Sequence, residues 1–356
     1  MSNFSCPVVE IETIVPHPNA DRLEIAKIAG YNVVVGKDDF VSGQKAIYVP
    51  ESAVVPEDVL EPAGLLGKLS GPAKNRVRAR KLRGVLSQGI LLPLYLYGLG
   101  GAPVGKDCSW ALNITKYEPP IPIHMQGEVW SPNTGILSYD VESLQKYPDE
   151  FSDSDFVYVT EKIHGTLCEI SFVQNLIGEP NAFGGCLITS KGLARKNLAF
   201  KNNEANKNNL YVRTALPITD AMQNLQVNTV IFGEIYGDGV QDLKYGLDKG
   251  QVEFRVFDIL QYDQELFSYL PMNFFNIQNL CHSLGLKTVP VLASGNWSYI
   301  KSRLQDYMGP HSSIGPNIRE GIVVRRDGDF FSHQTYALKL VSEAYLLRRG
   351  NTTEYN

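Results

Sequence analysis

The sequence has few cysteines, and their arrangement argues against a disulfide framework or a zinc site. The five cysteines of the 356-residue chain are scattered, odd in number and never spaced as C-x-x-C. Disulfide-stapled domains and zinc sites show paired or closely spaced cysteines instead. We therefore expect a reducing, intracellular setting and a cytoplasmic protein.

Long hydrophobic runs are also missing. The most apolar stretch, residues 90–99, is interrupted by Pro93 and falls far short of the ~20 residues that a membrane helix needs. The first residues lack the basic-then-apolar pattern of a secretion signal. Internal repeats and low-complexity tracts are absent as well, so we expect a soluble, globular and unsecreted protein.

The chain has no excess of positive charge. Its formal net charge is −5, so any contact with nucleic acid must come from local basic patches. Two stretches could form them: residues 74–83 carry six basic residues in ten, and residues 191–213 carry six against one acid. In the first, Arg76, Arg78 and Arg80 alternate as they would along one face of a strand. A solvated surface is the alternative for either stretch.

The length indicates two domains, because single cores stop growing at about 250–300 residues. Residues 1–115 contain short β-branched and aromatic runs bounded by turn residues, which predicts a small β-barrel. Residues 116–133 contain four prolines, which rule out a continuous helix or an inner strand. We place the boundary there, giving one domain over residues 1–118 and a second over residues 119–356.

The second domain is predicted to be α+β. Strand-like segments resume at residue 156 and continue to residue 341. Helical candidates lie between them at residues 210–226 and 272–284, the second entered through Pro271. Strands with irregularly interspersed helices favour an α+β fold over a regular βαβ series.

The hexapeptide EKIHGT, residues 161–166, contains a candidate nucleophile in Lys162. A free lysine with a pKa of ~10.4 is almost fully protonated at neutral pH, and only the neutral amine is nucleophilic. Lowering this pKa by ~3 units takes ~4 kcal/mol, which a desolvated pocket, another cation or a bound metal can supply. Without such surroundings, Lys162 would be an ordinary lysine at a strand-to-turn junction.

EKIHGT resembles the nucleotidyltransferase motif of the RNA ligase 2 branch of ATP-dependent polynucleotide ligases, in which the motif lysine becomes covalently attached to AMP. The other motifs of that superfamily follow in the expected order across the second half of the chain. They are SKGLARKN (190–197), FGEIYG (232–237), FRVFDI (254–259), EGIVVR (320–325) and ALKL (337–340). The resemblance implies an ATP-grasp-like ligase domain of antiparallel sheets with helices.

The motif residues suit phosphoryl transfer, which depends mainly on in-line positioning and on neutralising charge. The resemblance implies that Lys162 is the nucleophile and that Lys339 contacts the α-phosphate, where its charge would also favour a neutral Lys162. It implies that Glu320 acts on Mg²⁺ or Mn²⁺ through metal-bound water, because magnesium keeps much of its hydration. A strand-end lysine and a surface acid are the ordinary alternatives for Lys339 and Glu320.

The resemblance also implies contacts with the nucleoside. Glu234 would hydrogen-bond the ribose hydroxyls and share in metal binding, since an unpaired acid in its apolar run would be costly to bury. Phe257 would stack on adenine in preference to Phe254, because the two point to opposite faces of a strand. An exposed strand face for Glu234 and core packing for Phe257 are the alternatives. Further nucleotide contacts are implied for Glu161, Ile163, Lys191 and Arg195, the last two competing for one motif position.

His164 stands where most DNA ligases and capping enzymes have aspartate, and this difference points to the RNA ligase 2 branch. The resemblance implies a catalytic part for His164, with a structural histidine as the alternative, while Gly165 would allow a tight turn. Two positions depart from the pattern. Leu167 replaces the usual asparagine after the first motif, and Ala337 replaces the first of two lysines often found in the last one.

The first domain adds a second, shorter resemblance. HPNADRLEIAKI, residues 17–28, resembles the opening of OB-fold tRNA-binding modules and agrees with a five-stranded barrel. OB-folds commonly bind nucleic acid along a basic groove, which Arg76, Arg78 and Arg80 would supply. An OB-like module ahead of the transferase domain is the arrangement of one RNA ligase family. The chain ends 17 residues after Lys339, so we expect no carboxy-terminal OB domain of the DNA ligase or capping type.

The leading interpretation is an ATP-dependent RNA ligase with ATP and Mg²⁺ or Mn²⁺ as cofactors. Its partner would be RNA with 5′-phosphate and 3′-hydroxyl ends, in a nicked duplex, a tRNA break or an RNA–DNA hybrid. Two alternatives stay open: a GTP-using capping-type transferase, which would retain guanylate, and a non-catalytic RNA-binding protein, which would retain no nucleotide covalently.

Overall fold

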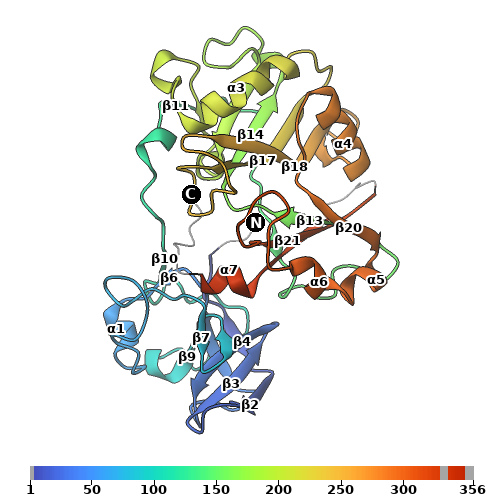
Figure 1. Cartoon of the computed structure of the whole chain (residues 1–356). Helices are drawn as coiled ribbons and strands as arrows, with labels where there is room; N and C mark the ends of the chain where they lie inside the picture. The colour runs from blue at the N-terminus through green and yellow to red at the C-terminus, as the bar shows by residue number, and fades with distance from the viewer. Residues whose placement is uncertain (1–3, 329–335, 349–356) are drawn as a thin grey trace.

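The structure, a computed structural model, describes residues 4–328 and 336–348. Its first domain is a small barrel of short strands, which carries two three-stranded sheets, β2-β3-β4 and β1-β5-β9, and the hairpin β7-β8 (Figure 1). The elements are β1 (Val8–Glu10), β2 (Thr13–Pro16), β3 (Leu23–Ile28), β4 (Tyr31–Gly36), β5 (Lys45–Val49), β6 (Ala53–Val54), α1 (Glu57–Leu60), β7 (Arg80–Leu82), β8 (Val85–Ser87) and β9 (Ile90–Pro93), with a 3₁₀ turn at Leu94–Tyr97.

Strand β5 lies between two hydrophobic clusters. Ile47 packs with Val8 and Leu92 in one cluster, whereas its neighbour Ala46 packs with Ile28 in the other. Consecutive residues of a strand point to opposite faces, so one short apolar strand serves both clusters. The predicted barrel of short strands is confirmed.

The structure corrects the predicted arginine face. Of the three arginines only Arg80 belongs to a strand, whereas Arg76 forms isolated bridges with Val54 of β6 and with Ser70. Its side chain is 7% exposed, its guanidinium carbon lies 3.6 Å from the ring centroid of Tyr117, and burial lowers its pKa. Arg78 is half-buried and Arg80 exposed. The ring of Tyr117 offers Arg76 a cation–π contact, which holds this side chain in the interior.

The proline-rich connector contains only short elements, as predicted. Strand β10 (Thr115–Lys116) pairs with β6 of the first domain, a 3₁₀ turn follows at Ile123–Met125, and β11 (Val129–Trp130) pairs with β16 (Ala199–Phe200) of the second. The boundary after residue 118 stays a prediction.

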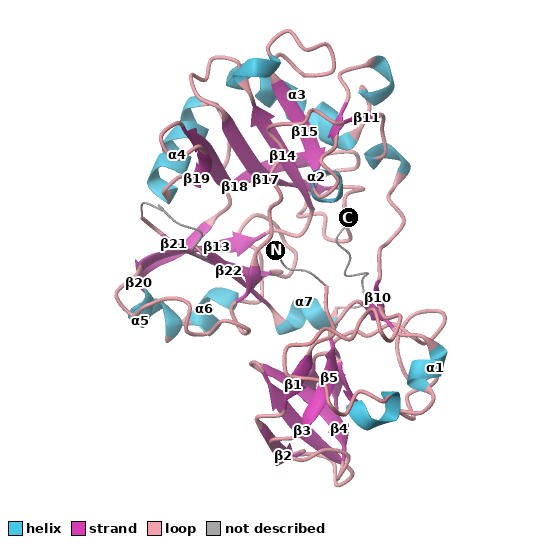
Figure 2. Cartoon of the chain, turned by 180° about the vertical axis from the view of Figure 1, so that it is seen from behind, coloured by secondary structure: helices cyan, strands magenta, loops and turns pink. Residues whose placement is uncertain are grey.

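The second domain contains two five-stranded sheets with few helices (Figure 2), which confirms the α+β prediction. The strand orders are β12-β22-β21-β13-β20 and β15-β14-β17-β18-β19, and only the β12–β22 pair is parallel among the described strands. The strands are β12 (Glu142–Ser143), β13 (Phe156–Lys162), β14 (Thr166–Phe172), β15 (Cys186–Ser190), β17 (Thr229–Gly237), β18 (Val252–Asp263), β19 (Ser268–Pro271), β20 (Val291–Asn296), β21 (Gly321–Arg326) and β22 (Ala337–Val341).

Helices α3 and α5 each pack on one of the two sheets. Helix α3 packs on β14 and β15, burying Leu210 and Ala215 against Ile170, while Trp297 of α5 packs on Val157 of β13. The helices are α2 (Lys191–Ala194), α3 (Leu210–Met222), α4 (Phe274–Ser283), α5 (Trp297–Lys301), α6 (Leu304–Met308) and α7 (Glu343–Leu347), with 3₁₀ turns at Gln174–Leu176 and Glu204–Asn206. None of the described helices has the length and apolarity to span a bilayer.

Candidate active site

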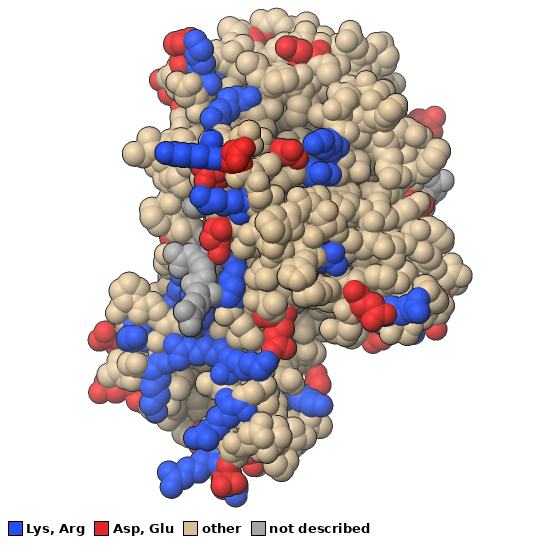
Figure 3. Space-filling model, in the orientation of Figure 1, with Lys and Arg blue, Asp and Glu red and all other residues tan. Residues whose placement is uncertain are grey.

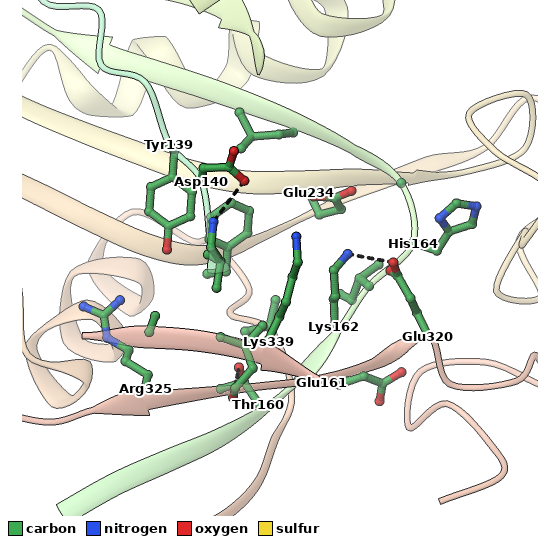
Figure 4. Close-up of a pocket in the computed structure, with 18 of the residues that line it drawn as sticks. Tyr139, Asp140, Thr160, Glu161, Lys162, His164, Glu234, Glu320, Arg325 and Lys339 are labelled. Carbon is green, nitrogen blue, oxygen red and sulfur yellow. Dashed lines mark hydrogen bonds and ion pairs between the residues drawn. The ribbon is translucent and has the colours of Figure 1, made fainter. Parts of the chain in front are cut away.

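A pocket lies between the two sheets, where the turn after β13 crosses from one sheet to the other (Figure 4). It encloses about 1040 Å³ of empty space, a volume that includes space open to solvent. Its walls come from residues 160–167, from β17 and β18, from β21 and β22, and from the segment 139–141.

The floor of the pocket carries an ion pair between Lys162 and Glu320. Lys162 ends β13 and pairs with Gly321, so Glu320, one residue earlier, lies beside it. The distance between Lys162 Nζ and Glu320 Oε1 is 2.7 Å, and the side chains are 20% and 6% exposed. The second oxygen, Oε2 of Glu320, is buried and has no hydrogen-bond partner among the described residues. An oxygen of this kind can accept from a bound ligand or its hydration shell.

Lys339 brings a second amine into the pocket. It lies on β22, pairs with Val323 of β21, and is therefore on the same sheet as Lys162. Its side chain points toward the space beside Lys162 (Figure 4). Two amines at one end of a pocket create a local positive potential that suits an anionic group.

The opposite sheet supplies Glu234 and Phe257. Glu234 lies on β17 opposite Leu167, and its carboxylate faces the pocket (Figure 4). Phe257 occupies a bulge of β18, because the pairing with β17 passes from Val256 to Asp258 and skips Phe257. Phe257 also lines the pocket. Phe254 packs instead against Gly233, where a side-chain carbon on the glycine would overlap its ring.

Lys191 and Arg195 converge on a residue that sequence reasoning missed. Lys191 Nζ lies 3.5 Å from Asp140 Oδ1, and Arg195 approaches Asp140 Oδ2 at 3.4 Å. Lys191 lines the pocket together with Tyr139 and Asp140, whereas Arg195 lies outside the described lining and is 37% exposed. No motif marks Tyr139 or Asp140, and the segment GILSYDVE, residues 135–142, carries no local signal that sets Asp140 apart from Glu142.

The Glu161 carboxylate points away from Lys162 although the residue lines the pocket, and its contact with the nucleotide stays a prediction. It accepts from the Ser313 backbone N–H at 2.8 Å and lies 3.6 Å from Arg319 Nε, and the residue is 1% exposed. Consecutive residues of a strand face opposite sides, so the Glu161 carboxylate points the opposite way from the Lys162 amine. Ile163 lines the pocket and packs with Tyr236.

The His164 imidazole is also directed away from Lys162 (Figure 4). Its Nε2 lies 2.8 Å from Asp242 Oδ1, and its Nδ1 lies 2.9 Å from the Tyr345 hydroxyl. Arg348 pairs with the same aspartate at 2.8 Å. Burial opposes ionisation of Asp242, but the hydrogen bonds from His164 and Arg348 outweigh it and lower the pKa of Asp242. The ring therefore anchors the turn after Lys162, which agrees with the structural alternative for His164, and its catalytic part stays a prediction.

A buried ion pair ties the two sheets together at the back of the pocket. Arg325 of β21 contacts Asp258 of β18 at 2.6 Å, and both side chains are buried. The hydroxyls of Tyr139 and Tyr336 donate to the other oxygen of Asp258 at 2.9 and 2.7 Å. Breaking such a pair would leave a buried charge without a partner, so it holds the sheets at a defined separation.

Comparisons with known proteins agree with this arrangement. A family model described as RNA ligase matches residues 155–341, and an OB-fold domain matches residues 6–94. The structure of the Naegleria gruberi RNA ligase with PPi is similar, with a TM-score of 0.77 and 24% identity over 97% of this chain and 98% of that one. A lysine-to-methionine mutant of that ligase with AMP and Mn has a TM-score of 0.78 and 25% identity, over 97% and 98% of the two chains. No curated protein sequence matches the chain.

Proposed function

This chain belongs to the RNA ligase family, and we propose that it is an ATP-dependent ligase that forms a lysyl-AMP intermediate on Lys162. It passes the AMP to a 5′-phosphate end of RNA and joins that end to a 3′-hydroxyl, releasing AMP. The observation that carries the proposal is the meeting of Lys162, Lys339 and Glu320 in one pocket. The similar Naegleria gruberi ligase holds AMP and Mn, which supports a nucleotide and a divalent ion here.

The lining fits a nucleotide in one orientation. The Phe257 ring offers a stacking surface for adenine, and the Glu234 carboxylate can accept from the ribose hydroxyls. Lys339 then lies at the phosphate end with Lys162. Its charge helps to balance the α-phosphate, which is a main requirement of phosphoryl transfer.

The residues also fit a hydrated divalent ion. The described residues contain no group of three or more His, Cys, Asp and Glu that could hold a metal, so no all-protein cage exists in them. Magnesium typically keeps several waters and binds through one or two carboxylates and the substrate phosphates. Glu320, with its buried and unpartnered Oε2, and Glu234 are the carboxylates placed to contact that hydration shell. When bound, the ion neutralises charge on the reacting phosphate.

The Lys162–Glu320 pair controls the proton on the nucleophile. The carboxylate stabilises the protonated amine in the resting site and is also the nearest acceptor for its proton, at 2.7 Å. Lys339 beside the α-phosphate would favour the neutral amine, as would a divalent ion whose hydration shell Glu320 would contact. The amine then forms the N–P bond while the bond from the α-phosphorus to pyrophosphate breaks.

RNA would bind through exposed basic side chains. Lys and Arg side chains gather over the amino-terminal domain on the face shown in Figure 3. Arg80, Lys81 and Arg83 are exposed in and beside β7, and Arg78 is half-buried, whereas Arg76 is too buried to contribute. We expect RNA affinity to fall with salt, as phosphate contacts require. The preferred break, a nicked duplex, a tRNA break or an RNA–DNA hybrid, and a cytoplasmic location stay predictions.

The test is mass spectrometry of the protein after incubation with ATP and Mg²⁺, with GTP as the matched nucleotide. We expect an AMP adduct on the peptide that contains Lys162, no guanylate, and no adduct in Lys162→Arg. Guanylate on wild type would favour the capping-type reaction. Wild type and Lys162→Arg both free of nucleotide, yet both binding RNA, would favour a non-catalytic protein.

A further inference from the structure

The amino-terminal domain contacts the catalytic sheet next to the strand that carries Lys339. The turn Ala29–Gly30, between β3 and β4, lies against residue 145, and Gln145 Nε2 donates to the Gly30 carbonyl at 3.4 Å. Tyr31 follows the turn; burial raises its pKa, and a hydrogen bond with Ser143 partly offsets the rise. Tyr31 and Gln145 are half-buried beside this contact, whereas Ala29 and Gly30 at the tip of the turn are exposed.

The close approach of the turn to residue 145 requires glycine at position 30. Its φ is +78° and that of Ala29 is +44°, so both lie in the left-handed region of a tight hairpin turn. A Cβ on Gly30 would overlap the carbonyl oxygen of Gln145, which is backbone and cannot rotate away. Any side chain at position 30 must therefore push the backbone at residue 145.

Residue 145 continues from the strand that supports Lys339. Strand β12 contains only Glu142 and Ser143; it is the edge strand of its sheet, and Ser143 pairs with Lys339 of β22. The Leu144 N–H donates to the Lys339 carbonyl at 2.8 Å. A two-residue edge strand has few bonds of its own to resist fraying. The contact between Gln145 and the first domain supports the segment that follows this strand.

A second contact joins the same domain to the turn after Lys162. Lys81 of β7 pairs with Glu343 of α7 at 2.7 Å, and the Tyr345 hydroxyl of the same helix lies 2.9 Å from His164 Nδ1. The ion pair is half-exposed and stabilises little by itself. Helix α7 nevertheless contacts both the first domain, through Glu343, and His164, which anchors the turn after Lys162.

We propose that the amino-terminal domain is a positioning element for nucleotide transfer, and that Gly30 and Gln145 hold the Lys339 strand in register. The proposal rests on the proposed function of Lys339 and adds to any contact that the domain makes with RNA. A displacement of Lys339 by about 1 Å is enough to slow a reaction that depends on alignment.

Two alanine variants of the full-length protein test it. Gly43 has a φ of +79°, almost that of Gly30, but a Cβ there would meet no heavy atom within 4 Å. Gly43→Ala therefore reproduces the backbone strain of Gly30→Ala without touching the interface. In the absence of RNA and at saturating ATP, we expect the rate of AMP attachment to fall at least tenfold in Gly30→Ala and to stay within twofold of wild type in Gly43→Ala.

Hydrogen exchange at residues 142–146 provides a readout that does not depend on activity. We expect faster exchange of the Leu144 amide in Gly30→Ala and wild-type exchange in Gly43→Ala. Equal rates and equal exchange in the two variants would overturn the proposal. If wild type attaches no AMP, the proposed function fails, and the exchange data still decide whether the contact supports β12.

A third variant covers the case in which Gly30→Ala does not fold. Gln145→Ala removes the amide contact with Gly30 without introducing a clash. We expect a threefold loss in the rate of AMP attachment, with faster exchange of the Leu144 amide. Wild-type rate and exchange in Gln145→Ala would then overturn the proposal.

Discussion

The Lys162 amine and the Glu320 carboxylate lie 2.7 Å apart although 158 residues separate them in the chain. The ladder between β13 and β21 brings them together, because Lys162 pairs with Gly321. One Glu320 oxygen holds the amine while the other is buried without a partner among the described residues. The same carboxylate is thus placed to restrain the nucleophile and to receive a metal-bound water.

Replacing Glu320 by glutamine should abolish most of the first chemical step. The amide cannot accept the Lys162 proton and interacts more weakly with a hydrated cation. We expect the rate of AMP attachment to fall about a hundredfold, the order lost with one preorganised electrostatic group, and to recover only partly at high Mn²⁺. Glu265→Gln, at an exposed position, is the control. A Glu320→Gln rate within threefold of wild type would contradict the assignment.

Lys191 and Arg195 share Asp140 but should differ in function. Lys191 lines the pocket and Arg195 does not, so only Lys191 is placed to contact bound ATP. We expect Lys191→Ala to raise the KM for ATP about tenfold, as loss of one charged contact predicts, and Arg195→Ala to change it less than threefold. Steady-state formation of labelled lysyl-AMP measures both, and a larger effect of Arg195→Ala would reverse the assignment.

Substitution of Phe257 should affect ATP binding, and substitution of Phe254 should affect the stability of the fold. Phe257→Ala removes the stacking surface in the pocket, so we expect weaker ATP binding with a small change in melting temperature. Phe254→Ala leaves a void against Gly233 and should lower the free energy of unfolding by about 3 kcal/mol. Calorimetric titration with ATP and thermal unfolding measure the two quantities. The interpretation fails if Phe254→Ala, and not Phe257→Ala, weakens binding in the folded protein.

Glu169 should make stability depend on pH. Burial raises the pKa of its carboxyl from 4.5 to about 8, although the Leu137 N–H and the Ser171 hydroxyl both donate to it. Between these pH values the unfolded chain releases a proton that the folded protein keeps, so stability falls as pH rises from 4.5 to 8, by on the order of 1 kcal/mol per pH unit.

The neutral variant Glu169→Gln should lose this slope. Its free energy of unfolding, measured with urea from pH 5 to pH 9, should decline less than that of wild type, and the gap should stop widening above pH 8. Parallel curves for the two proteins would show that Glu169 is ionised in the fold.

Local sequence patterns predicted much of the fold and part of the candidate site. Alternating and β-branched runs predicted the strands, and the helical candidate at residues 210–226 corresponds to Leu210–Met222. The motif order predicted that Lys162, Glu320 and Lys339 belong to one reaction, and the structure places all three in one pocket. These features depend on residue type, period and spacing, which are properties of short segments.

By itself, then, the sequence determined the α+β class, the family and the two pocket lysines. Only the tertiary structure decided that the side chains of Glu161 and His164 point away from Lys162, that Arg76 is buried, and that Asp140 joins the site. The physical reason is that a side chain's surroundings depend on register and on packing between strands far apart in the chain. A repeating sequence pattern specifies which residues share one face of a strand, but not which part of the protein that face packs against.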